Sequence, residues 1–173
     1  MNPILSTTRP AIERLFEPHS IALVGATERS IWSIAAVDNL KRSGYAGKIH
    51  MVNPKGGTIF GRQAYTSVVE IGEPVDAALL MVPESKMLDV FDDLKAAQVG
   101  GVVILSSGFA ETGDEGAERQ RQIAARAREY GIRIIGPNCL GFANFTANTP
   151  IWTTPLRRGL PDASLAVVSQ SGA

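Results

Sequence analysis

Cysteine and histidine are scarce in this sequence, which has one cysteine and two histidines among 173 residues. A single cysteine excludes an internal disulfide and is typical of proteins in a reducing compartment. These residues are too few to build a structural zinc site from its usual ligands, so we expect no metal site. Neither sign of charge is in excess, because 17 basic residues balance 17 acidic ones. This balance argues against a strongly basic surface for nucleic acid.

Long apolar runs are also missing. None approaches the roughly 20 residues that a membrane-spanning helix needs. The start of the chain lacks the basic cluster and the apolar centre of a signal peptide. We therefore expect a cytoplasmic protein with no membrane partner. Hydrophobic residues make up 45% of the chain, which is enough for a globular core and excludes wholesale disorder.

The sequence does contain a series of short apolar runs with little alternation between inward and outward positions. Such runs, rich in Val, Ile and Leu, are typical of strands covered on both faces. They occupy residues 21–24, 48–52, 76–82, 101–105, 133–135 and 165–168. Helical patterns lie between them, at residues 30–41 with Ser30 or Ser33 as the cap, and at 66–71, 85–98 and 114–130. This order predicts an α/β fold, an open parallel sheet with helices on both faces.

The alternation of strands and helices stops after residue 146. Residues 147–162 contain three prolines and no helical period, which predicts an extended linker. The last apolar run is followed at residues 169–172 by a small polar turn of the kind that opens a helix. We therefore divide the chain into an N-terminal segment (1–14), the α/β domain (15–146), a linker (147–162) and the start of a second domain (163–173), and expect it to be part of a longer protein.

The turn after the first predicted strand is a candidate anion site. In an open parallel sheet, ligands bind beyond the carboxyl ends of the strands. Gly25 permits a tight turn there, and Thr27, Arg29 and Ser30 offer hydrogen-bond donors beside the N-terminus of the next helix. Free backbone amides at a helix N-terminus favour an anion. The alternative is an ordinary strand-to-helix loop with a capping serine.

The second predicted strand is followed by a lysine rather than an acidic residue. A dinucleotide-binding fingerprint needs G-x-G-x-x-G after the first strand and, about 20 residues later, an acidic residue for the ribose. Of the glycine motif only Gly25 is present, and Lys55 stands where the acidic residue would be. A lysine there attracts a phosphate, which fits the 3′-phosphate of coenzyme A (CoA) or the 2′-phosphate of NADP and fits plain NAD poorly. Otherwise Lys55 is a solvated surface lysine.

Small and polar residues also follow the later strands. Pro83 ends the third strand and offers an apolar shelf. Ser106, Ser107 and Gly108 follow the fourth, where the serines donate hydrogen bonds and the glycine lets a ligand approach closely. Asn138 lies in the turn after the fifth. The concentration of such residues at successive strand ends predicts a ligand site along this edge of the sheet.

Together these turns resemble the N-terminal CoA-binding domain of the nucleoside-diphosphate-forming acyl-CoA synthetases, a superfamily that includes the alpha chain of succinyl-CoA synthetase and ADP-forming acetyl-CoA synthetase. The matching segments are residues 21–27, 52–55, 106–113 and 136–141. The resemblance implies a Rossmann-like fold, with the start of a ligase-type domain at 169–172. It also implies contacts with the coenzyme from Thr27, Glu28, Arg29, Ser30, Lys55, Val82, Pro83, Ser106, Ser107 and Gly108, with Asn138 near its thiol end.

In this superfamily acyl-CoA, ADP and phosphate react to give the acid, CoA and ATP, through an acyl phosphate and a phosphorylated histidine. The resemblance implies that this histidine, the ATP-grasp unit, and the ATP or ADP with Mg belong to other domains of the parent enzyme. We then expect the chain itself to bind CoA or acyl-CoA, to partner the ligase-type and ATP-grasp domains, and to supply no catalytic residue. The alternatives are a non-catalytic CoA-binding module, the synthetase-like part of a protein acyltransferase, and an NADP-binding redox domain.

The start of the first helix departs from the superfamily, which usually has glycine where this chain has Ile31, Trp32, Ser33 and Ile34. Trp32 has three alternatives: it covers the pocket, stacks on the adenine, or packs in the core. Because large aromatic side chains usually bury area, we expect Trp32 in the core. Ile34 is expected to face inward with the later apolar residues at three-residue spacing.

Overall fold

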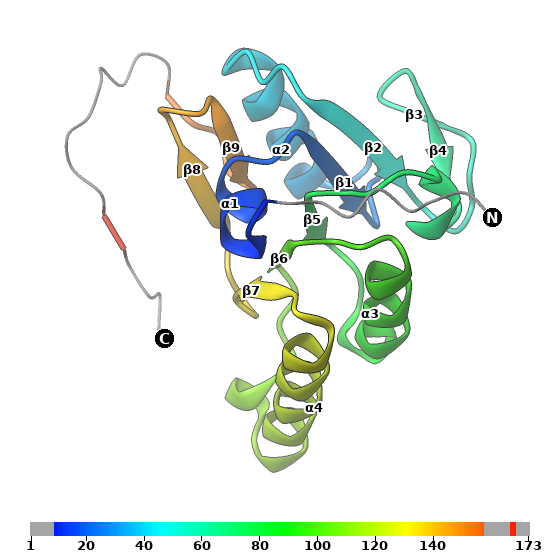
Figure 1. Ribbon diagram of the computed structural model, residues 1–173, viewed down its shortest axis with the longest axis vertical. Coiled ribbons are helices and arrows are strands. Elements are labelled where there is room, and N and C mark those ends of the chain that lie inside the picture. Colours follow the sequence, from blue (N-terminus) through cyan, green and yellow to red (C-terminus); the bar gives the residue numbers. More distant parts are fainter. Residues whose placement is uncertain (1–8, 158–166, 169–173) are drawn as a thin grey trace.

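The computed structural model describes residues 9–157 and 167–168. At its centre is a seven-stranded sheet in the order β3-β4-β2-β1-β5-β6-β7 (Figure 1). The strands are β1 (Ser20–Val24), β2 (Lys48–Val52), β3 (Thr58–Ile59), β4 (Arg62–Tyr65), β5 (Ala77–Leu80), β6 (Gly101–Ile104) and β7 (Arg133–Ile135). All neighbours pair in parallel except β3 and β4, which form an antiparallel hairpin at one edge. The predicted open parallel sheet is confirmed.

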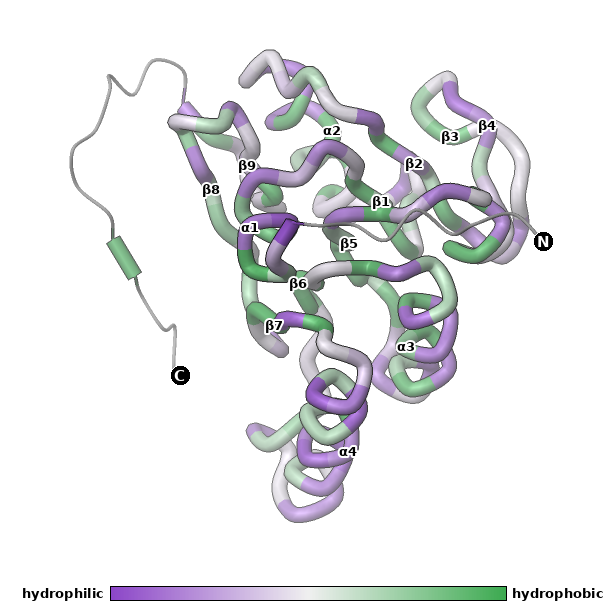
Figure 2. Tube along the Cα trace, viewed as in Figure 1, coloured by the Kyte–Doolittle hydropathy of each residue, from purple (hydrophilic) through white to green (hydrophobic). Residues whose placement is uncertain are grey.

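Both faces of the sheet are covered, because its central strands bury side chains on either side. On one face, Ala22 and Leu80 belong to a core with α3 (Met87–Ala96) and α4 (Asp114–Tyr130). On the other, Ile21 and Leu23 belong to a core with α2 (Ile31–Arg42) and with the hairpin of β8 (Gly141–Asn144) and β9 (Thr149–Trp152). The short α1 (Ala11–Phe16) contacts β6. Figure 2 shows hydrophilic and hydrophobic stretches alternating along α3 and α4, as expected for helices with one buried face.

The helix boundaries agree with the sequence analysis to different degrees. α4 has the bounds predicted for it, and α2 begins directly after Ser30, which is therefore the cap. α3 begins later than predicted, because residues 84–86 form a 3₁₀ turn, η2 (Glu84–Lys86). The helix predicted at 66–71 is only a 3₁₀ turn, η1 (Val69–Ile71), and a third such turn, η3 (Ala110–Thr112), precedes α4.

Part of the predicted linker is a strand of the folded unit. β9 lies within residues 147–162, and its Ile151 is fully buried. The side-chain amide of Asn39 in α2 donates to the carbonyl groups of Trp152 and Thr154, both at 2.8 Å. The segment is extended as expected, but it pairs and packs because its apolar and polar groups find partners in β8 and α2. The boundaries between domains stay a prediction.

The first and last predicted segments, 1–14 and 163–173, can be compared with the structure only in part. α1 lies mostly within the predicted segment 1–14, and the buried Arg14 pairs through Nε with Oδ1 of Asp76 at 2.7 Å. Of the strand predicted at 165–168 the structure describes only residues 167 and 168, which are in no strand. The rest of that strand, and of the second domain predicted at 163–173, lies outside the described residues.

The expectation that Trp32 packs in the core is wrong, since its side chain is 38% exposed. Ile34, also expected to face inward, is 45% exposed. α2 faces the sheet through small residues, including Ser33 and Ala36, which are fully buried. Because these residues let the helix lie close to the strands, its bulky neighbours in the first turn are left outside the core.

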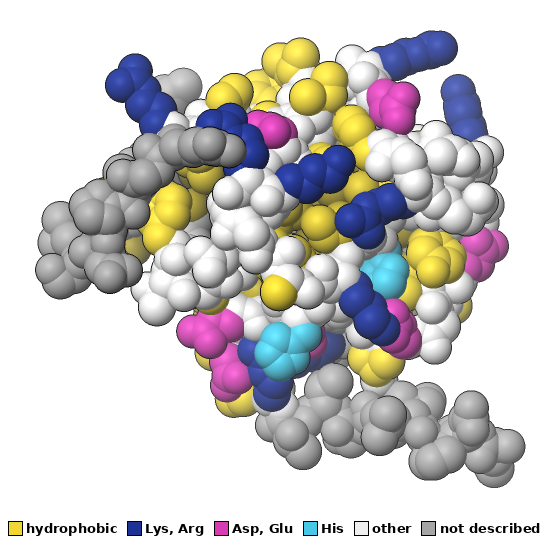
Figure 3. All heavy atoms as spheres, turned by 90° about the horizontal axis from the view of Figure 1, so that it is seen from above, with side chains coloured by type: hydrophobic (Ala, Val, Ile, Leu, Met, Phe, Trp, Pro, Cys, Tyr) yellow, Lys and Arg dark blue, Asp and Glu magenta, His cyan; other side chains and the backbone are white. Residues whose placement is uncertain are grey.

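Lysine and arginine side chains are scattered over the face of the molecule shown in Figure 3, among apolar and uncharged ones. None of the helices in the described part of the chain has both the length and the apolar character needed to traverse a bilayer.

Candidate functional site

β1 lies where the order of the strands along the chain reverses, with β2 on one side and β5 on the other. In such sheets the crevice beyond the carboxyl ends at this point is the usual ligand site. Gly25 directly follows β1 there, and its N–H donates to the carbonyl of Val52 at 2.8 Å. A Cβ added to Gly25 would lie 2.5 Å from the carbonyl oxygen of Met81. The missing side chain therefore lets the chain leaving β1 lie against the chain leaving β5.

Residues 27–30 lead from β1 to the N-terminus of α2. The Ser30 hydroxyl accepts from the N–H of Ser33 at 3.4 Å, and the Ser33 hydroxyl accepts from the N–H of Thr27 at 3.2 Å. These bonds fix the turn against the first turn of the helix. The free amides of a helix N-terminus carry partial positive charge, so this 12-residue helix presents it at the carboxyl edge of the sheet.

One cation, Arg29, lies in this turn, and another, Lys55, lies in the loop after β2. Arg29 and Lys55 are exposed, and neither forms an ion pair with a residue that the structure describes. The nearby carboxylate of Glu28 is engaged elsewhere, because its Oε1 accepts from the N–H of Phe60 at 2.6 Å. The turn and the loop after β2 thus each keep one positive side chain available to an anion.

Asn53 joins the exit of β2 to the exit of β1, a role that was not predicted from the sequence. Its Nδ2 donates to the carbonyl of Ala26 at 2.9 Å, and its Oδ1 accepts from the N–H of Lys55 at 3.0 Å. These two bonds place the Lys55 loop beside the turn that follows β1. The Asn-Pro pair after a buried strand was the available signal, since asparagine side chains commonly bond to the backbone two residues later.

Hydrogen bonds also join the exits of β5, β6 and β7. The Ser106 hydroxyl donates to the carbonyl of Val82, and the Ser106 carbonyl accepts from the N–H of Asn138 at 3.0 Å. The structure therefore brings these three predicted site residues together, with Pro83 and Ser107 exposed beside them. Because the single hydroxyl proton of Ser106 is used within the protein, it offers a ligand only acceptor lone pairs.

The edge beyond β5 and β6 carries carboxylates that the sequence analysis did not place at the site. Glu84 packs against Gly108, where an added Cβ would lie 3.0 Å from its Cγ. Oε1 of Glu111 accepts from the N–H of Gly108 at 2.6 Å, and Arg119 donates to the Gly108 carbonyl at 3.1 Å. Although burial acts against it, hydrogen bonds from the backbone amides of this turn lower the pKa of Glu111. Arg29 and Lys55 therefore lie at the β1–β2 end of the edge, whereas two carboxylates and the guanidinium of Arg119 lie at the β5–β6 end.

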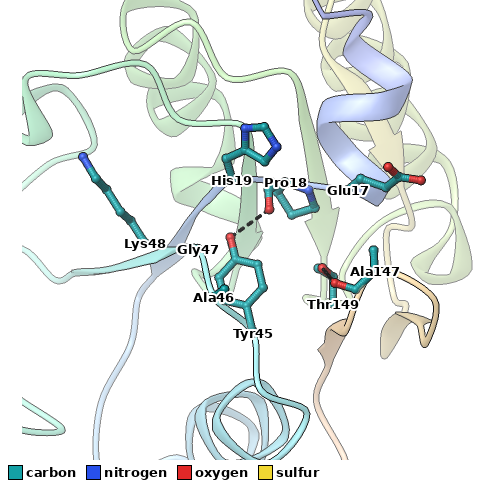
Figure 4. A pocket seen from close by; sticks show the side chains of 9 residues that line it. All are labelled: Glu17, Pro18, His19, Tyr45, Ala46, Gly47, Lys48, Ala147 and Thr149. Atoms are coloured by element: carbon teal, nitrogen blue, oxygen red, sulfur yellow. Dashed lines mark hydrogen bonds between the residues drawn. The ribbon is translucent and has the colours of Figure 1, made fainter.

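A cavity of about 450 Å³ lies at the opposite edge of the sheet, near the amino ends of β1 and β2 (Figure 4). The Tyr45 hydroxyl there donates to the carbonyl of Pro18 at 3.0 Å, and the Lys48 ammonium bonds to Glu73 at 2.6 Å. None of the residues predicted as a ligand site lines this cavity. We take the carboxyl edge as the candidate site, because the strand order and the unpaired cations both point there.

Comparison with known proteins shows the family of the chain. Residues 19–144 match the family described as CoA binding domain. The chain belongs to this family. The resemblance drawn from the turns is thereby confirmed.

Several relatives of this CoA-binding domain are named as ADP-forming ligases. The acetate–CoA ligase (ADP-forming) I subunit alpha of Pyrococcus furiosus is 40% identical over 170 residues, which is 94% of this chain and 36% of that protein. The 4-hydroxybutyrate–CoA ligase (ADP-forming) of Nitrosopumilus maritimus is 31% identical over 159 residues, which is 92% of this chain and 23% of that protein. The chain thus spans between 23% and 36% of the length of these relatives.

A solved structure confirms the fold. The dinucleotide-forming acetyl-coenzyme A synthetase 1 of Candidatus Korarchaeum cryptofilum, in complex with phosphate and ADP, aligns with a TM-score of 0.77 at 36% identity. The alignment covers 83% of this chain and 31% of that one. The CoA-binding domain therefore has the α/β, Rossmann-like arrangement of part of a ligase.

Proposed function

We propose that this domain holds CoA or acyl-CoA at the carboxyl edge of its sheet, as part of an ADP-forming acyl-CoA synthetase. The observation that carries the proposal is the meeting of the α2 N-terminus, capped by Ser30, with Arg29 and Lys55, which have no carboxylate partner among the described residues. CoA carries a diphosphate and a ribose 3′-phosphate. Helix N-terminal amides and cationic side chains are the groups that proteins use to bind such anions.

The distribution of charge along the edge supports one orientation of the coenzyme. The 3′-phosphate lies near Lys55, and the diphosphate lies near Ser30 and the first turn of α2. The uncharged pantetheine arm then runs past the exits of β5, β6 and β7, away from Arg29 and Lys55. The residues proposed to line it are Val82, Pro83, Ser106, Ser107, Gly108 and Asn138. Gly25 fits this arrangement, because the place of a side chain there is taken by the carbonyl of Met81.

The ligase reaction itself belongs to parts of the relatives that this chain does not cover. We infer that the whole protein interconverts acid, CoA and ATP with acyl-CoA, ADP and phosphate. ATP or ADP with Mg would supply the phosphoryl chemistry in the ligase-type and ATP-grasp domains. The residues of this chain bind and orient the coenzyme and supply no catalytic group. A cytoplasmic location is part of the proposal, supported by the single cysteine.

Calorimetric titration of the chain with CoA tests the proposal. We expect binding that weakens with added salt, since it depends on exposed charges. Lys55→Ala should weaken it about tenfold, the effect of losing one charge-assisted contact to phosphate. Lys41→Ala is the matched control, because Lys41 is an exposed lysine at the other end of α2 with no ion pair to a described residue.

Three results would count against the proposal. No heat and no thermal shift at millimolar CoA would contradict CoA binding. Tighter binding of NADPH than of CoA in a competition experiment would favour the redox alternative. Equal effects of the two lysine variants on CoA affinity would show that Lys55 does not contact the coenzyme.

A further inference from the structure

The hairpin of β3 and β4 turns on an unusual pair of residues. Ile59 pairs with Arg62, so Phe60 and Gly61 form the turn. Both have a positive φ, +50° and +72°. This conformation is typical of two-residue hairpin turns, which normally carry Asn-Gly or Gly-Gly. A bulky aromatic residue is strained there, and tertiary contacts hold Phe60 in place, since its side chain packs against the core that includes residues of α2.

Glu28 adds a hydrogen bond to this packing, from the turn after β1. The N–H of Phe60 donates to Oε1 of Glu28 at 2.6 Å, a short distance of the kind seen with charged acceptors. The two residues are 32 positions apart in the sequence, so this bond ties the tip of the hairpin to the candidate site. A carboxylate in this role serves the protein, whereas against a phosphate it would be repulsive.

The loop that carries Lys55 lies between β2 and this hairpin. At its start, Asn53 accepts from the N–H of Lys55 at 3.0 Å and donates to the carbonyl of Ala26 at 2.9 Å. At its end, the carbonyl of Gly57 accepts from the N–H of Ala64 at 2.8 Å. With the hairpin tip bound to Glu28, both sides of the loop are anchored to the turn after β1. A cation that is held in place loses less conformational entropy when it binds a ligand.

We propose that Glu28 is a positioning residue for Lys55 and not a ligand of the coenzyme, an inference that rests on the proposed function. Acting through the hairpin tip, its carboxylate fixes the loop of residues 53–57 so that the Lys55 ammonium meets the 3′-phosphate of CoA. This role differs from the one that the family resemblance implies, in which Glu28 contacts the coenzyme. It requires energetic coupling between Glu28 and Lys55 that a separate contact would not show.

Titration with CoA and with dephospho-CoA, which lacks the 3′-phosphate, tests this coupling. We expect Glu28→Ala to weaken CoA binding about two- to tenfold, the effect of one net hydrogen bond, and to leave dephospho-CoA binding unchanged. In a Lys55→Ala background the same change should have no further effect. Glu28→Gln should keep most of the affinity, because its amide oxygen still accepts from Phe60. Glu17→Ala is the control, an exposed glutamate at the opposite edge with no side-chain bond to a described residue, and it should bind as the wild type does.

The outcomes separate this inference from the proposed function. Failure of the wild type to bind CoA overturns both. If the wild type binds, unchanged CoA affinity in Glu28→Ala overturns the positioning role alone, and so does an equal loss for CoA and dephospho-CoA. Amide hydrogen exchange checks the bond without a ligand. The Phe60 amide should exchange faster in Glu28→Ala than in the wild type and in Glu17→Ala, and equal rates would contradict the bond.

Discussion

Replacing Gly25 by alanine tests whether the close approach of the exits of β1 and β5 builds the site. Gly25 has a φ of +83°, and a Cβ there would lie 2.5 Å from the carbonyl oxygen of Met81 and 2.9 Å from its carbon. Gly44 provides a matched control. Its φ is +72°, and a Cβ there would have no heavy atom within 4 Å. The difference between the two alanine variants therefore isolates the contact with the chain leaving β5.

The expected loss of stability follows from these two environments. Gly44→Ala should lower the free energy of unfolding by about 1–2 kcal/mol, the penalty of a left-handed conformation for a residue with a Cβ. Gly25→Ala carries the same penalty and also a contact that is roughly 1 Å shorter than an ordinary separation of heavy atoms. Overpacking of this kind costs about 1–3 kcal/mol more, so Gly25→Ala should lose about 2–5 kcal/mol in total.

Urea denaturation followed by circular dichroism measures both losses, and CoA titration shows whether the junction matters to the site. We expect Gly25→Ala to bind CoA more weakly than Gly44→Ala, because the exits of β1 and β5 must separate to admit the methyl group. A loss of stability no greater than that of Gly44→Ala would refute the steric argument. Normal CoA affinity in a destabilised Gly25→Ala would place the coenzyme away from this junction.

Two further predictions concern groups away from the candidate site. Asn39→Ala removes a side chain that donates to the Trp152 carbonyl at 2.8 Å and accepts from the Leu156 N–H at 3.0 Å. We expect urea denaturation to show a loss of about 2–3 kcal/mol in the free energy of unfolding, and the Leu156 amide to exchange faster. Unchanged exchange of this amide would contradict the bond. His50 is 9% exposed, and its Nε2 has no hydrogen-bond partner among the described residues. Burial lowers the pKa of His50 from 6.5, although the Glu73 carboxylate, 3.6 Å from Nε2, opposes this shift. As the pH falls, the unfolded chain therefore binds a proton at His50 before the folded chain does. The free energy of unfolding should be at its full value above about pH 6.5 and should decrease below it. A pH profile of urea unfolding that His50→Gln leaves unchanged would refute this.

The sheet could be predicted because its central strands are buried on both faces and its strands are bounded by polar residues. β2 and β7 have the predicted bounds, and each begins with a charged side chain, Lys48 and Arg133. The hairpin of β3 and β4 could not be predicted in the same way. β3 has only two residues, which is too short for a periodic signal, and Phe60 occupies a turn position where the usual signal is asparagine or glycine.

The chemistry of the candidate site could be predicted from residue types, but its internal hydrogen bonds could not. Glu28 and Ser106 follow β1 and β6 at the carboxyl edge of the sheet, and their contact with a ligand stays a prediction. Their partners, Phe60 and Val82, lie 32 and 24 positions away in the sequence. Such pairings depend on which strands are neighbours, and a loop sequence does not contain that information. The prediction for Trp32 was wrong for a related reason. The small residues of α2 let the helix lie close to the sheet and so leave Trp32 outside the core, and this distance cannot be read from the sequence of the helix.

The two halves of the edge are built separately and meet at Gly25. Bonds made by Glu28 and Asn53 hold together the exits of β1 and β2 and the tip of the β3–β4 hairpin, where the unpaired cations lie. Bonds made by Ser106 hold together the exits of β5, β6 and β7. A change within one half should therefore alter binding of only one part of the coenzyme, as proposed for Glu28 and the 3′-phosphate. Gly25→Ala acts where the halves join, so it should weaken CoA and dephospho-CoA alike, and a loss confined to CoA would show that the junction supports the phosphate end alone.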